Sequence, residues 1–188
     1  MVQATTQTLT LEEFLALPET KPASEYIDGA IIQKPMPQGK HSTLQRELFF
    51  ALTAAFKPKK IAQAFPELRC TFAGRSVVPD IAVFRTQRIP VDSNGEVANV
   101  FNRHPDWTIE ILSPNQSHTK VVRNSLHCLD NQTEMGWLLD PDESCISVYD
   151  ADKSVQVFEK ANTVLPVPAF AQTVQLTTEA IFDWLRAD

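Results

Sequence analysis

Two short segments of this chain are apolar on both faces of a β-strand, and they constrain the fold more than any other feature. Residues 76–84 read SVVPDIAVF, and residues 107–112 read WTIEIL. Side chains alternate between the two faces of a strand, so apolar residues at nearly every position indicate a strand that is covered on both sides. We therefore expect one central sheet with helices on its faces.

The rest of the chain supplies helices and further strands around these two segments. Apolar residues at helical spacing predict an amphipathic helix over residues 42–56, with Ser42 as its N-terminal cap. The other expected elements are a short helix at about 10–17, a β-hairpin at 24–33 (SEYI-DG-AIIQ), strands at about 61–65, 69–73, 136–140, 145–149 and 155–159, and helices at about 117–130 and 178–186. The sequence predicts a single mixed α/β (α+β) domain over residues 1–188, with a core at about 9–160.

Each of the two buried strands contains an acid, Asp80 in the first and Glu110 in the second. A charge buried without a partner costs several kcal/mol, so such acids normally have a cation or a metal beside them. Neighbouring strands lie about 5 Å apart, and two facing acids can therefore share one divalent ion. The alternative is structural: either acid could reach solvent at a strand end or pair with Arg75 or Arg85. Two acids in consecutive buried strands favour the functional interpretation.

Pro79 adds a constraint on the first of these strands. Proline has no N–H to donate to a ladder, so the strand must bulge, bend or lie at a sheet edge at this point. The irregularity is expected immediately before Asp80.

The charge balance limits the partners of the protein. Seventeen Lys and Arg against 23 Asp and Glu leave a net charge of −6. A protein that coats nucleic acid nonspecifically carries a basic surplus, so that class is disfavoured, whereas an enzyme that holds a metal with carboxylates agrees with this balance. No run of about 18 apolar residues and no signal-like N-terminus is found, so we expect a cytoplasmic protein with no membrane partner.

The two acids belong to an ordered set of motifs. Pro79-Asp80, followed at a distance by Glu110-Ile111-Leu112, resembles the signature of the PD-(D/E)xK nuclease superfamily. The wider set consists of EYIDG at 25–29, a helix opening at 41, VPDIAV at 78–83, IEILSP at 109–114 and GWLLDP at 136–141. This set resembles the Uma-two family of proposed restriction endonucleases and covers roughly residues 9–150.

The resemblance implies a restriction-endonuclease-like fold, with a central mixed sheet flanked by helices and an N-terminal hairpin. It implies an endonuclease that hydrolyses phosphodiester bonds in DNA and acts as a homodimer. It also implies Mg²⁺ or Mn²⁺ held by Asp80, Glu110 and the main-chain carbonyl of Ile111. The alternative is a catalytically inactive relative that serves as a nucleic-acid-binding or oligomeric module.

The signature also requires a lysine, and this chain departs from it at both expected positions. The superfamily places the lysine two residues after the Glu, where this chain has Leu112, and Uma-two relatives place it on the next helix, where this chain has Asn124. Lys120 lies one helical turn earlier on the same face and is the candidate catalytic cation. The alternative for Lys120 is a solvated surface lysine.

Two further acids are candidates for an additional ligand. Glu47 lies at the border of the apolar face of the 42–56 helix, and Glu25 lies in the hairpin, within the family-like EYIDG segment. Each acid also has a structural alternative to a ligand role: Glu47 could pair with a neighbouring arginine, and Glu25 could lie on an exposed strand face.

Overall fold

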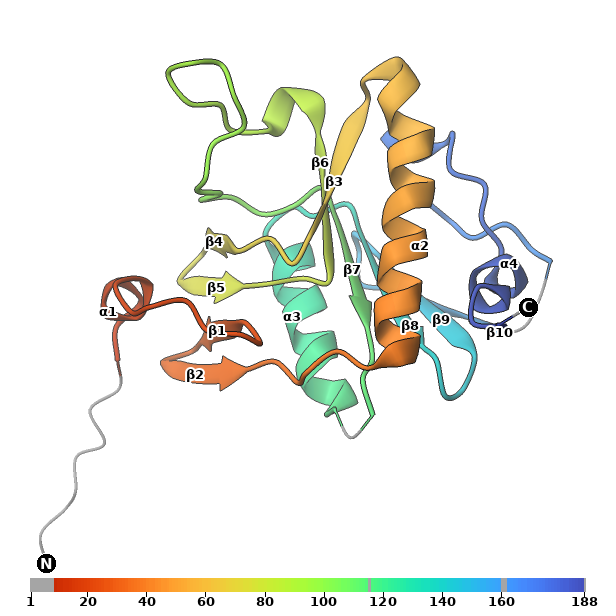
Figure 1. Ribbon diagram of the computed structural model, residues 1–188, viewed down its shortest axis with the longest axis horizontal. Coiled ribbons are helices and arrows are strands. Elements are labelled where there is room, and N and C mark those ends of the chain that lie inside the picture. The colour runs from red at the N-terminus through yellow and green to blue at the C-terminus, as the bar shows by residue number, and fades with distance from the viewer. Residues whose placement is uncertain (1–8, 115, 160–161, 188) are drawn as a thin grey trace, which may run out of the picture.

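The computed structural model describes residues 9–114, 116–159 and 162–187, which form four α-helices and two β-sheets (Figure 1). The helices are α1 (Leu11–Leu15), α2 (Gly39–Phe56), α3 (His118–Asp130) and α4 (Thr178–Asp183). The strands are β1 (Ser24–Ile27), β2 (Ala30–Gln33), β3 (Ala62–Pro66), β4 (Cys70–Phe72), β5 (Arg75–Val77), β6 (Ile81–Arg85), β7 (Trp107–Ile111), β8 (Met135–Asp140), β9 (Cys145–Asp150) and β10 (Val155–Glu159). None of the described helices is long and apolar enough to cross a membrane.

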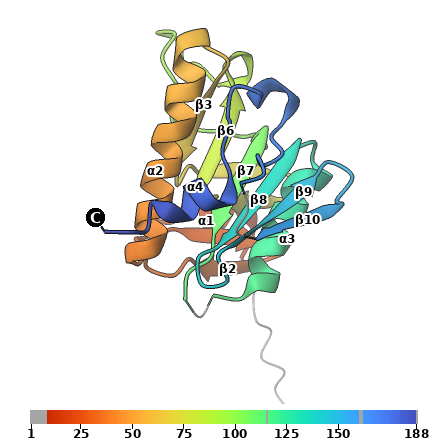
Figure 2. The ribbon, with the colours of Figure 1, turned by 90° about the vertical axis from the view of Figure 1, so that its right-hand side faces the viewer.

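The larger sheet has six strands in the order β10-β9-β8-β7-β6-β3. Only the β7–β8 pair is parallel, so the sheet is mixed, as the sequence predicts. Helices α2 and α4 cover one face of it, and α3 covers the other (Figure 2). The two strands that are apolar on both faces, β6 and β7, lie side by side in the interior of this sheet, which confirms the first expectation.

The main core lies between α2 and the six-stranded sheet. Leu44, Leu48 and Leu52 project from one stripe of the helix and are fully buried against the sheet. Trp107 and Trp137, from adjacent strands, pack edge to face with ring centroids 4.8 Å apart. This packing fixes β7 and β8 firmly in place, and β7 is the strand that bears Glu110.

The smaller sheet has the order β2-β1-β5-β4 and begins with the predicted hairpin. Asp28 and Gly29 have φ values of 52° and 86°, in the left-handed region that a two-residue hairpin turn of this kind requires. The register places Glu25 opposite Ile32. The hairpin therefore sets which side chains of β1 and β2 share a face.

The prediction of a single strand over residues 76–84 is wrong, because this segment forms two strands that belong to different sheets. β5 ends at Val77 in the small sheet, and β6 begins at Ile81 in the large one. The intervening corner, residues 78–80, contains Pro79, which cannot donate to either ladder. The irregularity predicted at Pro79 is thus a change of sheet, and it leaves Asp80 at the start of β6.

Two helix boundaries also differ from the sequence prediction. Helix α2 begins at Gly39, and its N-cap is Gln38, which makes no side-chain capping bond. Ser42 therefore lies inside the helix, where its N–H donates to the carbonyl of Gln38 at 2.9 Å. The closing helix α4 ends at Asp183, earlier than predicted.

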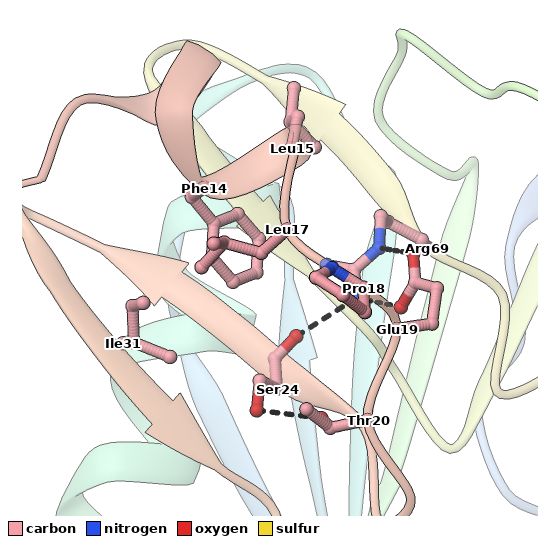
Figure 3. Close-up of a pocket in the computed structure, with 9 residues that line it drawn as sticks. All are labelled: Phe14, Leu15, Leu17, Pro18, Glu19, Thr20, Ser24, Ile31 and Arg69. Atoms are coloured by element: carbon pink, nitrogen blue, oxygen red, sulfur yellow. Dashed lines mark hydrogen bonds and ion pairs between the residues drawn. The ribbon is translucent and has the colours of Figure 1, made fainter.

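Arg69 attaches the N-terminal segment to the small sheet, beside a cavity of about 50 Å³ (Figure 3). Its guanidinium donates to the carbonyl of Ser24 at 3.0 Å and to Ser76 Oγ at 3.0 Å, and it pairs with Glu19 at 2.7 Å. The same group lies over the ring of Phe14, 5.1 Å from its centroid. One side chain thus connects α1, β1 and β5.

Arg69→Met is expected to lower the free energy of unfolding by about 2 kcal/mol, because two hydrogen bonds to a charged donor are lost at half-buried oxygens. Glu19→Gln is the matched control: the Glu19 side chain is 74% exposed, so its loss should cost less than about 1 kcal/mol. Urea denaturation of both variants measures the difference. Equal losses would show that the exposed ion pair, and not the contacts to the sheet, accounts for the effect.

Candidate active site

The two acids predicted from the buried strands lie next to each other across β6 and β7. The strands run antiparallel with Ile81 opposite Ile109, so Asp80, before β6, is the neighbour of Glu110. Both side chains point to the α3 side of the sheet, and both residues are at most 4% exposed. The structure therefore confirms their facing arrangement.

Donors from several elements hold the acids and the corner before β6. The N–H of Ile111 donates to Asp80 Oδ2 at 2.7 Å, and the N–H of Val78 donates to Glu25 Oε1 at 2.8 Å. Gln45 Nε2 of α2 donates to the carbonyl of Asp80 at 2.9 Å. The carboxylates of Asp80 and Glu25 are thus each held by a main-chain N–H from another part of the chain.

Glu25 of β1 belongs to the same cluster. The residue is 5% exposed, and its Oε2 accepts a hydrogen bond of 3.0 Å from Asn124 Nδ2 on α3. Asn124, the residue at the expected lysine position, therefore faces the acids as an uncharged donor. Its own Oδ1 is buried and lacks a hydrogen-bond partner among the described residues.

The cation beside the acids is Lys34, which directly follows β2 and which the sequence analysis missed. Its Nζ lies 2.7 Å from Asp80 Oδ1, 3.3 Å from Glu110 Oε2 and 2.7 Å from the carbonyl of Val78. The hairpin register contained the signal. Glu25 faces Ile32, and Lys34 lies two residues after Ile32, just beyond the end of β2, so Lys34 projects from the same face as Glu25.

The remaining sequence candidates lie outside this cluster. Lys120 is exposed on the first turn of α3, and no ion pair with Asp80 or Glu110 is found for it among the described contacts. Glu47 is half-buried and pairs with Arg46 at 2.7 Å, as its structural alternative proposed. Ile111 contributes its N–H to Asp80, and the ligand role of its carbonyl stays a prediction.

The electrostatics differ sharply between the two central acids. Burial opposes ionisation of Asp80, but the Lys34 ammonium and the His41 ring hold the pKa of its carboxyl well below the usual value. Burial raises the pKa of Glu110 well above the usual value, and the Lys34 charge offsets this only in part. Burial likewise raises the pKa of Glu25. The environment therefore favours the charged form of Asp80 and disfavours the charged forms of Glu110 and Glu25.

The cluster opens into a cavity of about 390 Å³, whose lining includes Lys34, Val78, Asp80 and Ser113. His41 of α2 also lines it, with Nε2 3.5 Å from Asp80 Oδ1 and Nδ1 3.1 Å from Ser113 Oγ. A ligand in the cavity can therefore approach Asp80 and the Lys34 ammonium.

The donor set of this cluster suits a hard divalent cation. Three oxygen atoms, from Asp80, Glu110 and the Val78 carbonyl, already converge on one positive group, the ammonium of Lys34. No three His, Cys, Asp or Glu side chains among the described residues are arranged to ligate a metal as they stand. The residues therefore fit Mg²⁺ or Mn²⁺ once the ammonium has moved aside.

The comparisons with known proteins agree with the fold and with the motif set. The sequence matches the profile of the Uma2 family, described as "Putative restriction endonuclease", over residues 11–179. A search of solved structures finds the crystal structure of "a putative nuclease belonging to DUF820" from Anabaena variabilis ATCC 29413. That chain is 56% identical with a TM-score of 0.93, and the match covers 95% of this chain and 99% of that one. The search of curated proteins finds no match.

The fold is restriction-endonuclease-like, as the residue motifs implied, with two sheets and the acids at the ends of the central strands. The family profile extends from α1 into α4 and includes every residue of the acid cluster. This chain belongs to the Uma2 family, whose description reads "Putative restriction endonuclease".

Proposed function

We propose that this protein is a metal-dependent endonuclease that hydrolyses phosphodiester bonds in DNA. The family and the similar solved structure support a nuclease function. The proposal rests on Asp80 and Glu110, which are buried side by side around the Lys34 ammonium, with Asp80 and Lys34 at the wall of a cavity. The homodimer and the cytoplasmic location expected from the sequence belong to the same proposal.

Asp80 and Glu110 would hold the divalent ion, with the carbonyl of Ile111 as the further ligand that the family resemblance implies. When bound, the ion supplies a more acidic water and stabilises the negative charge that develops on the phosphate. The N–H of Ile111 keeps the Asp80 carboxylate oriented, and the depressed pKa of Asp80 keeps it ionised without the ion. The protein therefore offers a preformed anionic ligand.

The reaction is the hydrolysis of one phosphodiester bond. The oxygen of a water molecule forms a bond to phosphorus, and the bond from phosphorus to one sugar oxygen breaks. One water proton ends on the leaving oxygen, and the other ends on the new phosphomonoester or in solvent. The chain's contribution is to position the phosphate at the cavity wall and to surround it with fixed charges.

Glu110→Gln tests this proposal with little disturbance of the fold, because the substitution preserves shape and burial raises the pKa of Glu110. Supercoiled plasmid and single-stranded DNA are incubated with Mn²⁺ or with EDTA. We expect cleavage by the wild type only with Mn²⁺, and a loss of at least about 100-fold in the variant. Calorimetry should show saturable Mn²⁺ binding that the variant loses.

Glu47→Gln is the matched control, since it makes the same chemical change on α2 outside the cluster. It should retain both cleavage and Mn²⁺ binding. A wild type that neither binds Mn²⁺ nor cleaves DNA would overturn the proposal and favour the inactive, nucleic-acid-binding alternative.

A further inference from the structure

The charge balance of the cluster singles out Lys34. Of the Lys and Arg side chains that the structure describes, only Lys34 forms an ion pair with Asp80 or Glu110. Its Nζ donates to Asp80 Oδ1 at 2.7 Å and to Glu110 Oε2 at 3.3 Å. Lys34 therefore supplies the positive charge beside these two buried acids.

The position of Lys34 also gives it access to a ligand. Its side chain is 13% exposed and lines the same cavity as Asp80 and His41. Lysine is seldom buried, because its ammonium is strongly hydrated, and a purely structural role would not require an opening to a cavity. An anion that enters the cavity meets this ammonium directly.

The backbone at Lys34 is anchored, and its side chain is long enough to have alternative rotamers. The N–H of Lys34 donates to the carbonyl of Ala23 at 2.9 Å, and the next residue is Pro35, whose ring restricts the chain. The side chain beyond this anchor has four flexible carbons. A change of rotamer would turn the ammonium from the carboxylates toward a phosphate in the cavity that Lys34 lines, with the backbone of the hairpin in place.

Asn124 approaches the same acids from the opposite side. Its Nδ2 lies 3.0 Å from Glu25 Oε2, so a longer, charged side chain at this position of α3 would reach the cluster. The β2–α2 connection and α3 thus converge on one group of carboxyls, and a single lysine on either side supplies the positive charge.

We propose that Lys34 is the catalytic cation of this site and neutralises the charge that develops on the phosphate, in the place of a lysine at position 124. This inference rests on the proposed nuclease function. It assigns to Lys34 the role for which the sequence favoured Lys120.

Lys34→Met tests the assignment by removing the charge while preserving most of the side-chain volume. We expect Mn²⁺-dependent cleavage to fall about 100-fold or more, the typical effect of losing one charge-stabilising donor. Calorimetric Mn²⁺ affinity should stay equal or become tighter, because a competing cation has left the carboxylates. Lys40→Met is the matched control: Lys40 pairs with Asp142 on the exposed surface, and cleavage should be unchanged.

The double variant Lys34→Met, Asn124→Lys provides a gain-of-function test and also covers the case in which the single variant does not fold. Circular dichroism establishes folding, and the double variant should recover at least about tenfold in cleavage over Lys34→Met, or be active where the single variant is unfolded. A folded but inactive double variant would contradict the inference.

Three further results would overturn the assignment while leaving the nuclease function intact. They are unchanged cleavage in Lys34→Met, a loss in Lys120→Met instead, or a loss in Lys34→Met that is matched by an equal loss of Mn²⁺ affinity. A wild type that cleaves no DNA with Mn²⁺ would overturn the proposed function, and the inference with it.

Discussion

Asp80→Asn is expected to abolish metal-dependent cleavage and to destabilise the protein at neutral pH. The variant loses an anionic ligand of the proposed ion, whose contribution to catalysis is several kcal/mol. Since each 1.4 kcal/mol is a factor of ten, we expect a loss of about 1000-fold. The folded metal-free protein also loses the partner of the Lys34 ammonium, 2.7 Å away, at a cost of about 3 kcal/mol.

The pH dependence of this stability loss has a definite sign. The pKa of Asp80 is lowered on folding, so its carboxylate contributes stability above the pKa of an unfolded aspartate, and this contribution is lost as the pH falls through the folded-state pKa. The difference between wild type and variant should therefore shrink in acid. Urea denaturation at neutral and acidic pH measures it.

Glu110→Gln is the internal control for this prediction. The pKa of Glu110 is raised on folding. At a pH above the pKa of an ordinary glutamate, the ionisation of Glu110 therefore lowers the stability of the folded protein. Glu110→Gln should then be at least as stable as the wild type at neutral pH, although both variants lose cleavage. If the two variants were equally destabilised, the unequal protonation of the two acids would be refuted.

Asp106→Ala is expected to lower the free energy of unfolding by about 3 kcal/mol or more. Asp106 is fully buried immediately before β7 and accepts bonds of 2.8 Å from the N–H of Arg85 and 2.9 Å from its Nε. Arg88 donates to it at 2.7 Å. The alanine variant leaves these donors without an acceptor and detaches the loop 86–106 from the start of β7.

Thermal and urea unfolding measure this effect, which corresponds to a fall in Tm of about 6–12 °C for a chain of this size. Asp142→Ala provides the comparison, because Asp142 is 66% exposed in its pair with Lys40 and should contribute less than about 1 kcal/mol. A loss of less than about 1 kcal/mol in Asp106→Ala would show that water hydrogen-bonds to Arg85 and Arg88 as well as Asp106 does.

The acids could be predicted from the sequence because their signal is local. Alternation within a strand places Asp80 and Glu110 on definite faces, and apolar neighbours on both sides show that the strands are buried. The hairpin turn at Asp28-Gly29 was predicted on the same local basis. The structure confirms their placement.

The features that the sequence prediction missed depend on tertiary structure. The change of sheet at Pro79 was missed because residues on both sides of it are apolar and buried, so composition does not change at the corner. The start of α2 was placed at Ser42 because Ser42 and Gln45 imitate a capping box, while the true cap, Gln38, has no side-chain bond. Lys34 was missed because its partners lie 46 and 76 residues away in the chain.

The change of sheet at residues 78–80 has a mechanical consequence for the charged cluster. Glu25 and Lys34 belong to the hairpin of the small sheet, whereas Asp80 and Glu110 belong to the large sheet, and the two sheets have no strand in common. The ion pairs of Lys34 therefore connect two sheets whose strands are not hydrogen-bonded to one another. A small rotation of one sheet against the other would change the distance between the Lys34 ammonium and the carboxylates. The geometry of this site therefore depends on the relative orientation of the two sheets.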